Sequence, residues 1–511
     1  MKRFLQILLI IFPVALFAQD YPLTGHFQNL NEKDIYYSSN STLIRPATGV
    51  ENEIYESLIY TTAKDSSKSW LNRKLFHEHF VVQEDEHLKL LLDPIVDFRI
   101  NKSINSFYHN PSFGYLNTRG ILINGNLDSK VFFNTSFFEN QGVFPDYINE
   151  YYETFGVIPG YGRVKPLSGF NEYDFAAAYG NISFKANERI DFTIGYDRLF
   201  IGDGYRSMIL SDYAAPMMYL KSSVKFGRFE YNNIFTKAIN PNFNNVIDLD
   251  QATNVNSLYP SKFISYNTLT YNLNSAWQFS LLEALVMSDE LPNWKVPLYT
   301  ISPFFRTAYI DKSNLTNNLI GTNITWQNQT IGIFYAQAIL DNWNVWNEPI
   351  VAMQFGYKSF NFLNVKNLYL QLEYNMTNYN AYKNTNNGLH YGHYNQPLAH
   401  PAGSDFDEFL MISAFTFKRF ELLAKINFLK VGTEDIFDYY PANDYSAFNS
   451  STSTAPWIVN SDFQIIYYIN RVTRLQVFVG INPRIDFIRN ADDCFIQAGL
   501  RTAIRSNYYD F

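Results

Sequence analysis

The stretch LYLQLEYNMT, residues 368–377, alternates between apolar and polar side chains over its whole length. Leu368, Leu370, Leu372, Tyr374 and Met376 fall on one side, and Tyr369, Gln371, Glu373 and Asn375 fall on the other. Successive side chains of a β-strand point to opposite faces, so one face suits lipid and the other suits water. The same period recurs in residues 190–197 and 475–482. In a soluble sandwich the apolar face would be core, so alternation alone leaves two all-β folds open.

The N-terminus, MKRFLQILLIIFPVALFAQD, predicts export. Lys2 and Arg3 precede an apolar run that ends near Phe17, and Ala18 offers a small residue for cleavage. This pattern is typical of a secretory signal peptide over residues 1–18. The alternative, an uncleaved anchor, is disfavoured because the run is short and Pro13 interrupts it. Cys494, the single cysteine, leaves no pair for a disulfide.

Composition favours the membrane alternative. Aromatic residues make up 18% of the chain, with 38 Tyr and 45 Phe, yet the mean hydropathy is −0.20. A polar average argues against a bundle of membrane helices, whereas a transmembrane β-barrel carries its signal in alternation. The net charge of −8 argues against nucleic acid as a partner. Together with export, these features predict an outer-membrane β-barrel, with outer-membrane lipid around it.

The connections between the alternating segments fall into two classes. Residues 185–189 and 470–474 form short ones, and residues 238–260, 377–406 and 430–456 form long polar ones. Outer-membrane barrels show this asymmetry between their two ends. The last alternating segment spans residues 494–504, and the chain stops at the aromatic Phe511. About 415 residues, at roughly 23 for each strand and its connection, predict about 16 to 18 antiparallel strands over residues 91–511.

Residues 19–90 have a different pattern. Ile54, Leu58 and Ile59, and then Trp70, Leu71 and Leu75, have helical spacing. We expect a small periplasmic region with one or two short helices. His77 and His79 are two positions apart, so on a helix they face different sides and predict no metal site.

The stretch GDGYRSMILSD, residues 202–212, concentrates charge between apolar residues. Gly202 and Gly204 permit a tight reversal, and the stretch lacks the Gly-Lys-Ser/Thr ending of a phosphate loop. We expect Arg206 to clamp Asp203 and Asp212 inside the barrel. The alternative is a glycan site in which Asp203, Arg206 and Asp212 meet sugar carboxylates or hydroxyls and Tyr205 stacks on a ring.

A hydrolase is the alternative function that we weigh from the enzyme class. Ser207 or Ser211, with His390, His393 or His400, would supply the residue types, but no GxSxG elbow is present. The same histidines, with Asp405 and Asp407, could instead ligate a divalent ion. We expect neither catalysis nor a bound metal or other cofactor.

Three segments carry a resemblance to a known family. Residues 116–142, 202–233 and 390–409 read LNTRGILINGNLDSKVFFNTSFFENQG, GDGYRSMILSDYAAPMMYLKSSVKFGRFEYNN and HYGHYNQPLAHPAGSDFDEF. In this order they resemble the Wzi-type capsule-assembly family of outer-membrane barrels, in the version found in Bacteroidetes beside gliding-motility proteins such as RemB. The third segment departs from the pattern with Ala399 where glycine is expected before the histidine. The resemblance implies a large barrel, a small periplasmic helical region and a role in assembling or holding surface polysaccharide.

Three functional hypotheses follow. The first is a non-enzymatic barrel that assembles, attaches or retains surface polysaccharide at the outer membrane. The second is a sugar-permeable porin. The third is an accessory of gliding motility or protein secretion, with components of those systems as partners.

Overall fold

The computed structural model describes residues 33, 36–37, 43–45, 68–105, 113–128, 130–162, 164–167, 172–239, 261–289, 315–341, 350–384, 386–431, 457–487, 491–502 and 508–510. The expected signal peptide, the first half of the expected helical segment 51–80 and Phe511 lie outside these residues.

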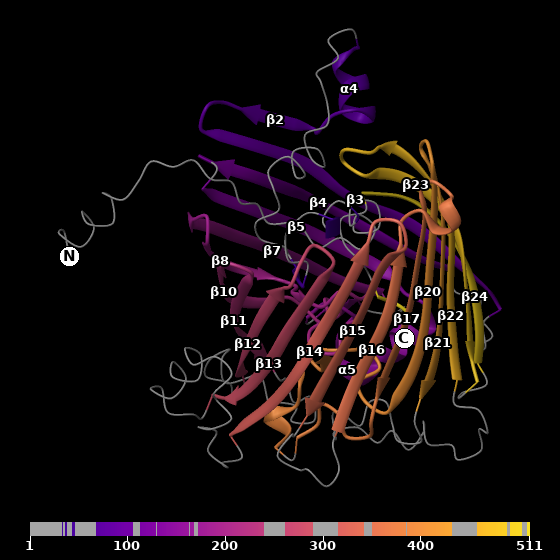
Figure 1. Cartoon of the computed structure of the whole chain (residues 1–511). Helices are drawn as coiled ribbons and strands as arrows, with labels where there is room; N and C mark the ends of the chain where they lie inside the picture. Colours follow the sequence, from indigo (N-terminus) through magenta and orange to yellow (C-terminus); the bar gives the residue numbers. More distant parts are fainter. Residues whose placement is uncertain are drawn as a thin grey trace, which may run out of the picture.

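Eighteen antiparallel strands form a closed barrel within the described part of the chain. Each strand pairs with the next one along the chain, and β24 pairs with β3 to close the ring (Figure 1). The strands are β3 (Leu88–Asn105), β4 (Phe113–Leu127), β5 (Val131–Val143), β7 (Glu172–Asn187), β8 (Ile190–Asp197), β10 (Met217–Phe226), β11 (Phe229–Ile239), β12 (Ser261–Asn272), β13 (Trp277–Ser288), β14 (Thr316–Asn328), β15 (Gly332–Asp341), β16 (Ile350–Ser359), β17 (Leu368–Thr377), β20 (Phe406–Phe417), β21 (Phe420–Val431), β22 (Trp457–Asn470), β23 (Leu475–Asp486) and β24 (Ala491–Thr502). The predicted fold class and strand number are confirmed.

Six further strands within the described residues are short and are not among the eighteen that close the barrel. They are β1 (Ile44–Arg45), β2 (Val81–Glu84), β6 (Lys165–Leu167), β9 (Phe200–Ile201), β18 (Gly392–His393) and β19 (Gln396–Pro397). β1 pairs with β9, and β18 pairs with β19. β2 and β6 extend the barrel sheet on β3 and β7.

The alternation in the sequence becomes the two faces of the wall. In β23, Val477 and Val479 are exposed on the outside, whereas Gln476 and Phe478 are buried on the inside. The stretch that spans β17 behaves likewise, since Gln371, Glu373 and Asn375 are buried in the lumen. The apolar face is therefore the outer one, as a lipid-facing barrel requires.

Aromatic side chains form a belt on the outer face at the short-turn end of the wall. In one part of the belt, the Phe226, Phe229 and Tyr271 rings follow one another at 5.5 and 4.8 Å. In another part, the rings of Trp277, Trp326, Phe334 and Tyr357 follow one another at 6.2, 5.6 and 4.7 Å. Aromatic belts mark the boundary between hydrocarbon and headgroups in membrane barrels.

Two α-helices have bounds within the described residues, and a short 3₁₀ turn occurs at each of η3 (Phe362–Asn364) and η4 (Asn387–Leu389). Helix α4 (Trp70–Phe76) begins at Ser69, whose hydroxyl accepts from the Asn72 amide. It lies within the expected helical segment. Helix α5 (Asp146–Phe155) was not predicted, and its buried Ile148, Tyr151 and Phe155 share one face. Gly156, at φ 69°, ends it.

Connections at the long-loop end fold into the barrel and form a luminal plug, defined here as residues 144–162, 198–216 and 378–405. Met208, Ile209 and Leu210 in its centre are fully buried and pack with inward residues of the wall such as Ala238 and Ile264. Two chain ends join them. Tyr36 and β1 contact residues 200–203, and Tyr508–Asp510 turn inward after β24.

Candidate functional site

Residues 202–212 cross the lumen as a buried turn in the plug. Gly202 adopts φ 148° and donates its amide to the Leu43 carbonyl at 2.7 Å. The Ser207 hydroxyl accepts from the amides of Ile209 and Leu210, both at 3.1 Å, which closes the turn locally. The predicted reversal is therefore present, and Tyr205 alone among the four candidate site residues is not fully buried.

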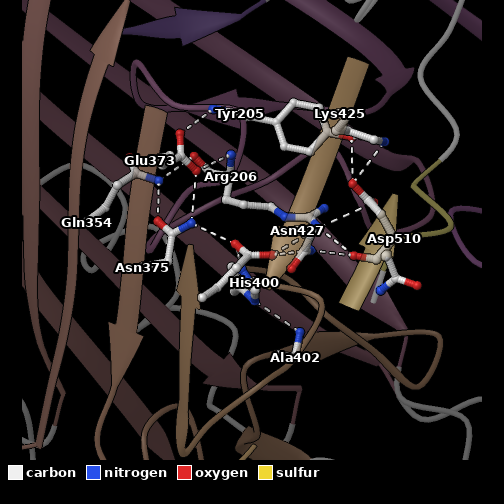
Figure 2. A network of polar contacts seen from close by, with 12 residues as sticks. Tyr205, Arg206, Gln354, Glu373, Asn375, His400, Ala402, Lys425, Asn427 and Asp510 are labelled. Atoms are coloured by element: carbon white, nitrogen blue, oxygen red, sulfur yellow. Dashed lines mark hydrogen bonds and ion pairs between the residues drawn. The ribbon is translucent and has the colours of Figure 1, made fainter. Parts of the chain in front are cut away.

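Arg206 lies between two acidic groups that come from distant parts of the chain (Figure 2). Its Nη2 is 3.3 Å from Glu408 Oε1 on β20 and 3.3 Å from Asp510 Oδ1 in the tail. It also donates to the Asp510 carbonyl at 2.9 Å. Burial opposes its charge, but Asp510 and Glu408 outweigh burial and raise the pKa of Arg206. The expectation of an internal clamp holds, but the expected partners, Asp203 and Asp212, are wrong.

Wall residues hold the backbone of this turn. The amides of Tyr205 and Arg206 donate to Glu373 Oε2 and Oε1 at 2.7 and 3.0 Å. Gln354 Nε2 donates to the Arg206 carbonyl at 2.8 Å (Figure 2). One carboxylate thus fixes two consecutive amides, which positions the Arg206 side chain toward Glu408.

Asp203 and Asp212 have separate environments. Asp203 accepts from Tyr36 Oη at 2.9 Å, Asn323 Nδ2 at 2.8 Å and Thr325 Oγ1 at 2.6 Å. Asp212 accepts from the Tyr508 hydroxyl. Burial raises the pKa of Asp212, against the opposing effects of Tyr508 and Arg198. Each residue therefore ties the turn to a different segment, one near the N-terminus and one near the C-terminus.

The histidines act as structural hydrogen-bonding groups in the third plug segment. His400 Nδ1 accepts from the Ala402 amide at 3.1 Å, so Nε2 carries the proton that it donates to Glu408 Oε2 at 2.7 Å. Burial lowers the pKa of His400. His393 and His390 accept backbone amides at Nδ1 from Ile239 and Asn384, both at 2.9 Å.

The hydrolase and metal alternatives find no assembled site among the described residues. Ser207 Oγ donates to the Ile201 carbonyl at 2.6 Å, and its other contacts are amides and Gln337. Within that part of the chain, neither the Ser207 nor the Ser211 hydroxyl forms a hydrogen bond with a histidine. In the same residues, no group of three or more His, Cys, Asp or Glu side chains could hold a metal ion.

A cavity of about 250 Å³ lies in the lumen beside the plug. The wall strands β3–β5 and β20–β24 line most of it, and Tyr205 and Asp510 contribute from the plug turn and the tail. Four further tyrosines line it: Tyr115, Tyr147, Tyr161 and Tyr509. The rest is rich in amides and charges, including Asn140, Asn460, Gln464, Gln497, Arg99, Arg484, Arg501 and Lys425.

Several residues of the site were missed from the sequence. Glu373 and Glu408 occupy inward positions of strands, where an acidic side chain needs a partner in the lumen. That signal was present in the quoted stretch 368–377. Asp510 lies beyond the last alternating segment, 494–504. No periodicity in the sequence indicates that this tail contacts Arg206 in the lumen.

Comparisons with known proteins support this architecture. No family profile matches the chain, and no curated protein sequence does. Among solved structures, it is similar to Wzi of Escherichia coli at 13% identity and TM-score 0.56, over 96% of this chain and 100% of that one. The chain has the fold of an outer-membrane β-barrel. Wzi is described as an outer-membrane protein involved in group 1 capsule assembly and as a carbohydrate-binding β-barrel.

Two further solved structures share the barrel more loosely. OccAB2 of Acinetobacter baumannii has 10% identity and TM-score 0.42, over 80% of this chain and 97% of that one. OccK5 of Pseudomonas aeruginosa has 8% identity and TM-score 0.39, over 80% of this chain and 96% of that one. At 13% identity, the likeness to Wzi concerns the fold and not the ligand.

Proposed function

We propose that this chain is a non-enzymatic outer-membrane barrel that binds surface polysaccharide and assembles or retains it at the cell surface. The luminal cavity is the observation that carries the proposal. Its lining combines several tyrosine rings with amide and guanidinium groups beside a buried plug. The fold likeness to a carbohydrate-binding barrel agrees with this function.

The cavity has the chemistry that sugars require. Tyrosine offers a flat apolar face for the C–H side of a pyranose and a hydroxyl for hydrogen bonding. Asn, Gln and Arg present paired donors and acceptors that match neighbouring hydroxyls. Clefts that combine apolar walls with a few placed polar groups are the usual form of small-molecule sites.

The candidate residues divide between two roles in this proposal. Tyr205 lines the cavity and is placed to contact a glycan, and its hydroxyl already accepts from Lys425 Nζ at 3.1 Å. Arg206, Asp203 and Asp212 are buried and act by holding the turn that carries Tyr205. The ligand-binding part of the predicted site thus reduces to Tyr205 together with cavity residues from the wall.

The other hypotheses remain as alternatives. A sugar-permeable porin needs a continuous aqueous path, and the buried plug opposes free diffusion along its side of the lumen. An accessory of gliding motility or secretion, as the Bacteroidetes resemblance implies, would co-purify with components of those systems. A mild-detergent pull-down followed by mass spectrometry tests that hypothesis.

The direct test measures glycan binding and folding side by side. Surface polysaccharide from the source cell is captured on immobilised barrel, and folded protein is quantified by heat-modifiable migration on gels. Tyr205→Ala should lower capture about tenfold, since the packing of an aromatic ring is worth up to about 1.5 kcal/mol beyond the area that it buries. Tyr467→Ala, on the lipid face, is the matched control and should leave capture unchanged. Equal capture by wild type, Tyr205→Ala and an unrelated barrel would refute the function.

A further inference from the structure

Arg501 has an unusual position among the cations of the luminal cavity. Three of the four lining cations have a carboxylate partner: Arg99 pairs with Asp97, Lys425 with Asp510 at 3.0 Å, and Arg484 with Asp486 at 3.3 Å. Arg501, on β24, has no ion pair with a carboxylate among the described residues.

The contacts of Arg501 with Gln464 and Phe478 hold its guanidinium in place without a direct ion pair. Nη2 donates to Gln464 Oε1 at 2.7 Å, and the guanidinium carbon lies 4.0 Å from the centre of the Phe478 ring. Nε is buried and has no hydrogen-bond partner in the described part of the chain. The stacked, half-satisfied guanidinium is therefore oriented and retains donors for another group.

Asp97 and Asp462 act electrostatically on Arg501, but neither forms an ion pair with it among the described residues. Arg99 also lies over Phe478, at 5.9 Å, and its charge is matched by Asp97. Asp462 accepts two hydrogen bonds from Gln464 Nε2, at 2.9 and 2.8 Å, so the amide of Gln464 separates it from Arg501. A group that pairs with Arg501 should therefore be an anion, and a planar carboxylate fits a guanidinium best.

We propose that the luminal cavity binds an acidic saccharide whose carboxylate pairs with Arg501, while the tyrosine faces on the cavity wall pack against its sugar rings. This inference rests on the proposed function and names its ligand class. It predicts that the cavity discriminates a uronic acid from the corresponding neutral sugar. The discrimination comes from one charge in a site where the other cations are already paired.

The test uses two probes that differ only in that charge. A disaccharide containing glucuronic acid and its carboxyl-reduced counterpart are titrated by calorimetry into the full-length barrel in detergent. The wild type should bind the acidic form about tenfold more tightly, the size expected for a charge-assisted pair. Arg501→Gln should bind both forms equally, and Arg228→Gln, at an exposed turn, should keep the preference. Heat-modifiable migration verifies folding of each variant.

A second variant keeps the inference testable if Arg501→Gln fails to fold. Asp462→Asn removes a negative charge near Arg501 while keeping an acceptor for Gln464, and should tighten binding of the acidic form by about threefold. Inorganic phosphate at matched ionic strength should not displace the disaccharide. Displacement by phosphate would mark a general anion site and overturn the saccharide assignment.

The outcomes separate this inference from the proposed function. Equal binding of both disaccharides by the wild type overturns the acidic assignment and leaves polysaccharide binding standing. Binding of neither disaccharide, with polysaccharide capture retained, also overturns the inference alone. Loss of both disaccharide binding and polysaccharide capture in the folded wild type refutes the proposed function itself.

Discussion

At the scale of single residues, Arg206 is the buried cation that balances two acidic side chains at the centre of the barrel. It compensates the carboxylates of Glu408 and Asp510, and Asn427 Nδ2 donates to Glu408 Oε1 and to the backbone carbonyl of Asp510. Buried ion pairs add little net stability compared with apolar packing, but removing one member leaves a charge without a partner. The arrangement therefore explains why an arginine lies in an otherwise apolar turn.

Replacing Arg206 should mainly weaken the folded barrel. Arg206→Ala removes the buried cation between two buried acids and leaves Glu408 only His400 and Asp510 only Lys425 as ionic partners, so the free energy of unfolding should fall by about 3 kcal/mol. Arg206→Lys should recover part of the loss, because lysine restores the charge without the planar fork. Denaturant titration followed by gel mobility measures this, and Arg228→Ala in an exposed turn is the control. Glycan capture should fall in proportion to folded protein, and a loss of capture with full stability would show instead that Arg206 contacts the ligand.

His393 makes stability depend on pH. Burial lowers the pKa of His393 to about 4, the charge of Lys262 acts in the same direction, and the hydrogen bonds to Pro216 and Ile239 oppose the shift. A lowered pKa means that its contribution is complete above about pH 6.5 and is lost as the pH falls toward 4, by up to about 3 kcal/mol. Denaturant titrations at pH 7.5, 5.5 and 4.5 should show a smaller loss for His393→Gln than for wild type. An identical pH profile for both proteins would contradict the assignment.

Residue partners were the least predictable part of the site. The residues 202–212 were recognised as an internal turn because glycine and charge interrupt an apolar run. Yet Arg206 meets Glu408 and Asp510 across separations of 202 and 304 residues, which no local pattern reports. Asp203 and Asp212 are closer in sequence and were therefore expected to pair with Arg206. They instead accept hydrogen bonds from the hydroxyls of Tyr36 and Tyr508.

At the scale of elements, the plug is a set of loops locked to one another as well as to the wall. Gln396 in β19 accepts from the Gly160 amide and donates to the Tyr161 carbonyl, both at 2.7 Å. The Ser211 amide donates to the Leu398 carbonyl at 2.8 Å, and Asn395 Nδ2 donates to the Phe155 carbonyl at 3.2 Å. The three plug segments therefore support one another through backbone groups.

Gln396→Ala should loosen this lock. It leaves the Gly160 amide and the Tyr161 carbonyl buried without their partner, at a cost of about 1–3 kcal/mol for each group. Hydrogen exchange read by mass spectrometry should quicken in residues 156–162 while the wall strands stay protected. Gln327→Ala removes one hydrogen bond at an exposed turn and serves as the matched control. Unchanged exchange in the Gln396 variant would mean that the loops hold their places independently.

Element prediction succeeded where periodicity was long and failed where loops fold inward. Strands such as β17 and β23 were evident from the alternation of side chains. Helix α5 was missed because it sits within a connection and has only ten residues, with Tyr and Asn among its buried positions. Helical spacing within residues 51–80 predicted one or two short helices, and α4 is a short helix in the part of that segment that the structure describes.

At the scale of the whole molecule, the lumen is occupied from both ends of the chain and by the loops between strands. Tyr36 and Tyr508 reach the same turn from opposite termini. Strand β3 begins at Leu88, and the contacts of Tyr36 and β1 tie part of the region before it to the barrel interior. Whether residues 19–90 form a separate periplasmic unit stays a prediction.

Occupation of the lumen should suppress ion flow. In planar bilayers, full-length protein should show little steady conductance, because the plug and the N-terminal contacts fill much of the cross-section. Deleting residues 19–80 should raise it, since Tyr36 and β1 then leave the turn at 200–203. Leu363→Ala, at an exposed turn, is the control. Large, stable currents from the full chain would favour the porin alternative.

The aromatic belt at the short-turn end has an optical consequence. Trp277 and Trp326 lie 6.2 Å apart on the lipid-facing side, next to Phe334. Two indoles so close exchange excitation energy, and their place at the membrane boundary exposes them to labels at one depth of the bilayer. In a variant whose other five tryptophans are replaced by phenylalanine, lipids brominated at successive positions along the acyl chain should therefore quench the emission of this pair most strongly at a single depth. The depth of strongest quenching would report how deeply the short-turn end of the barrel lies in the bilayer.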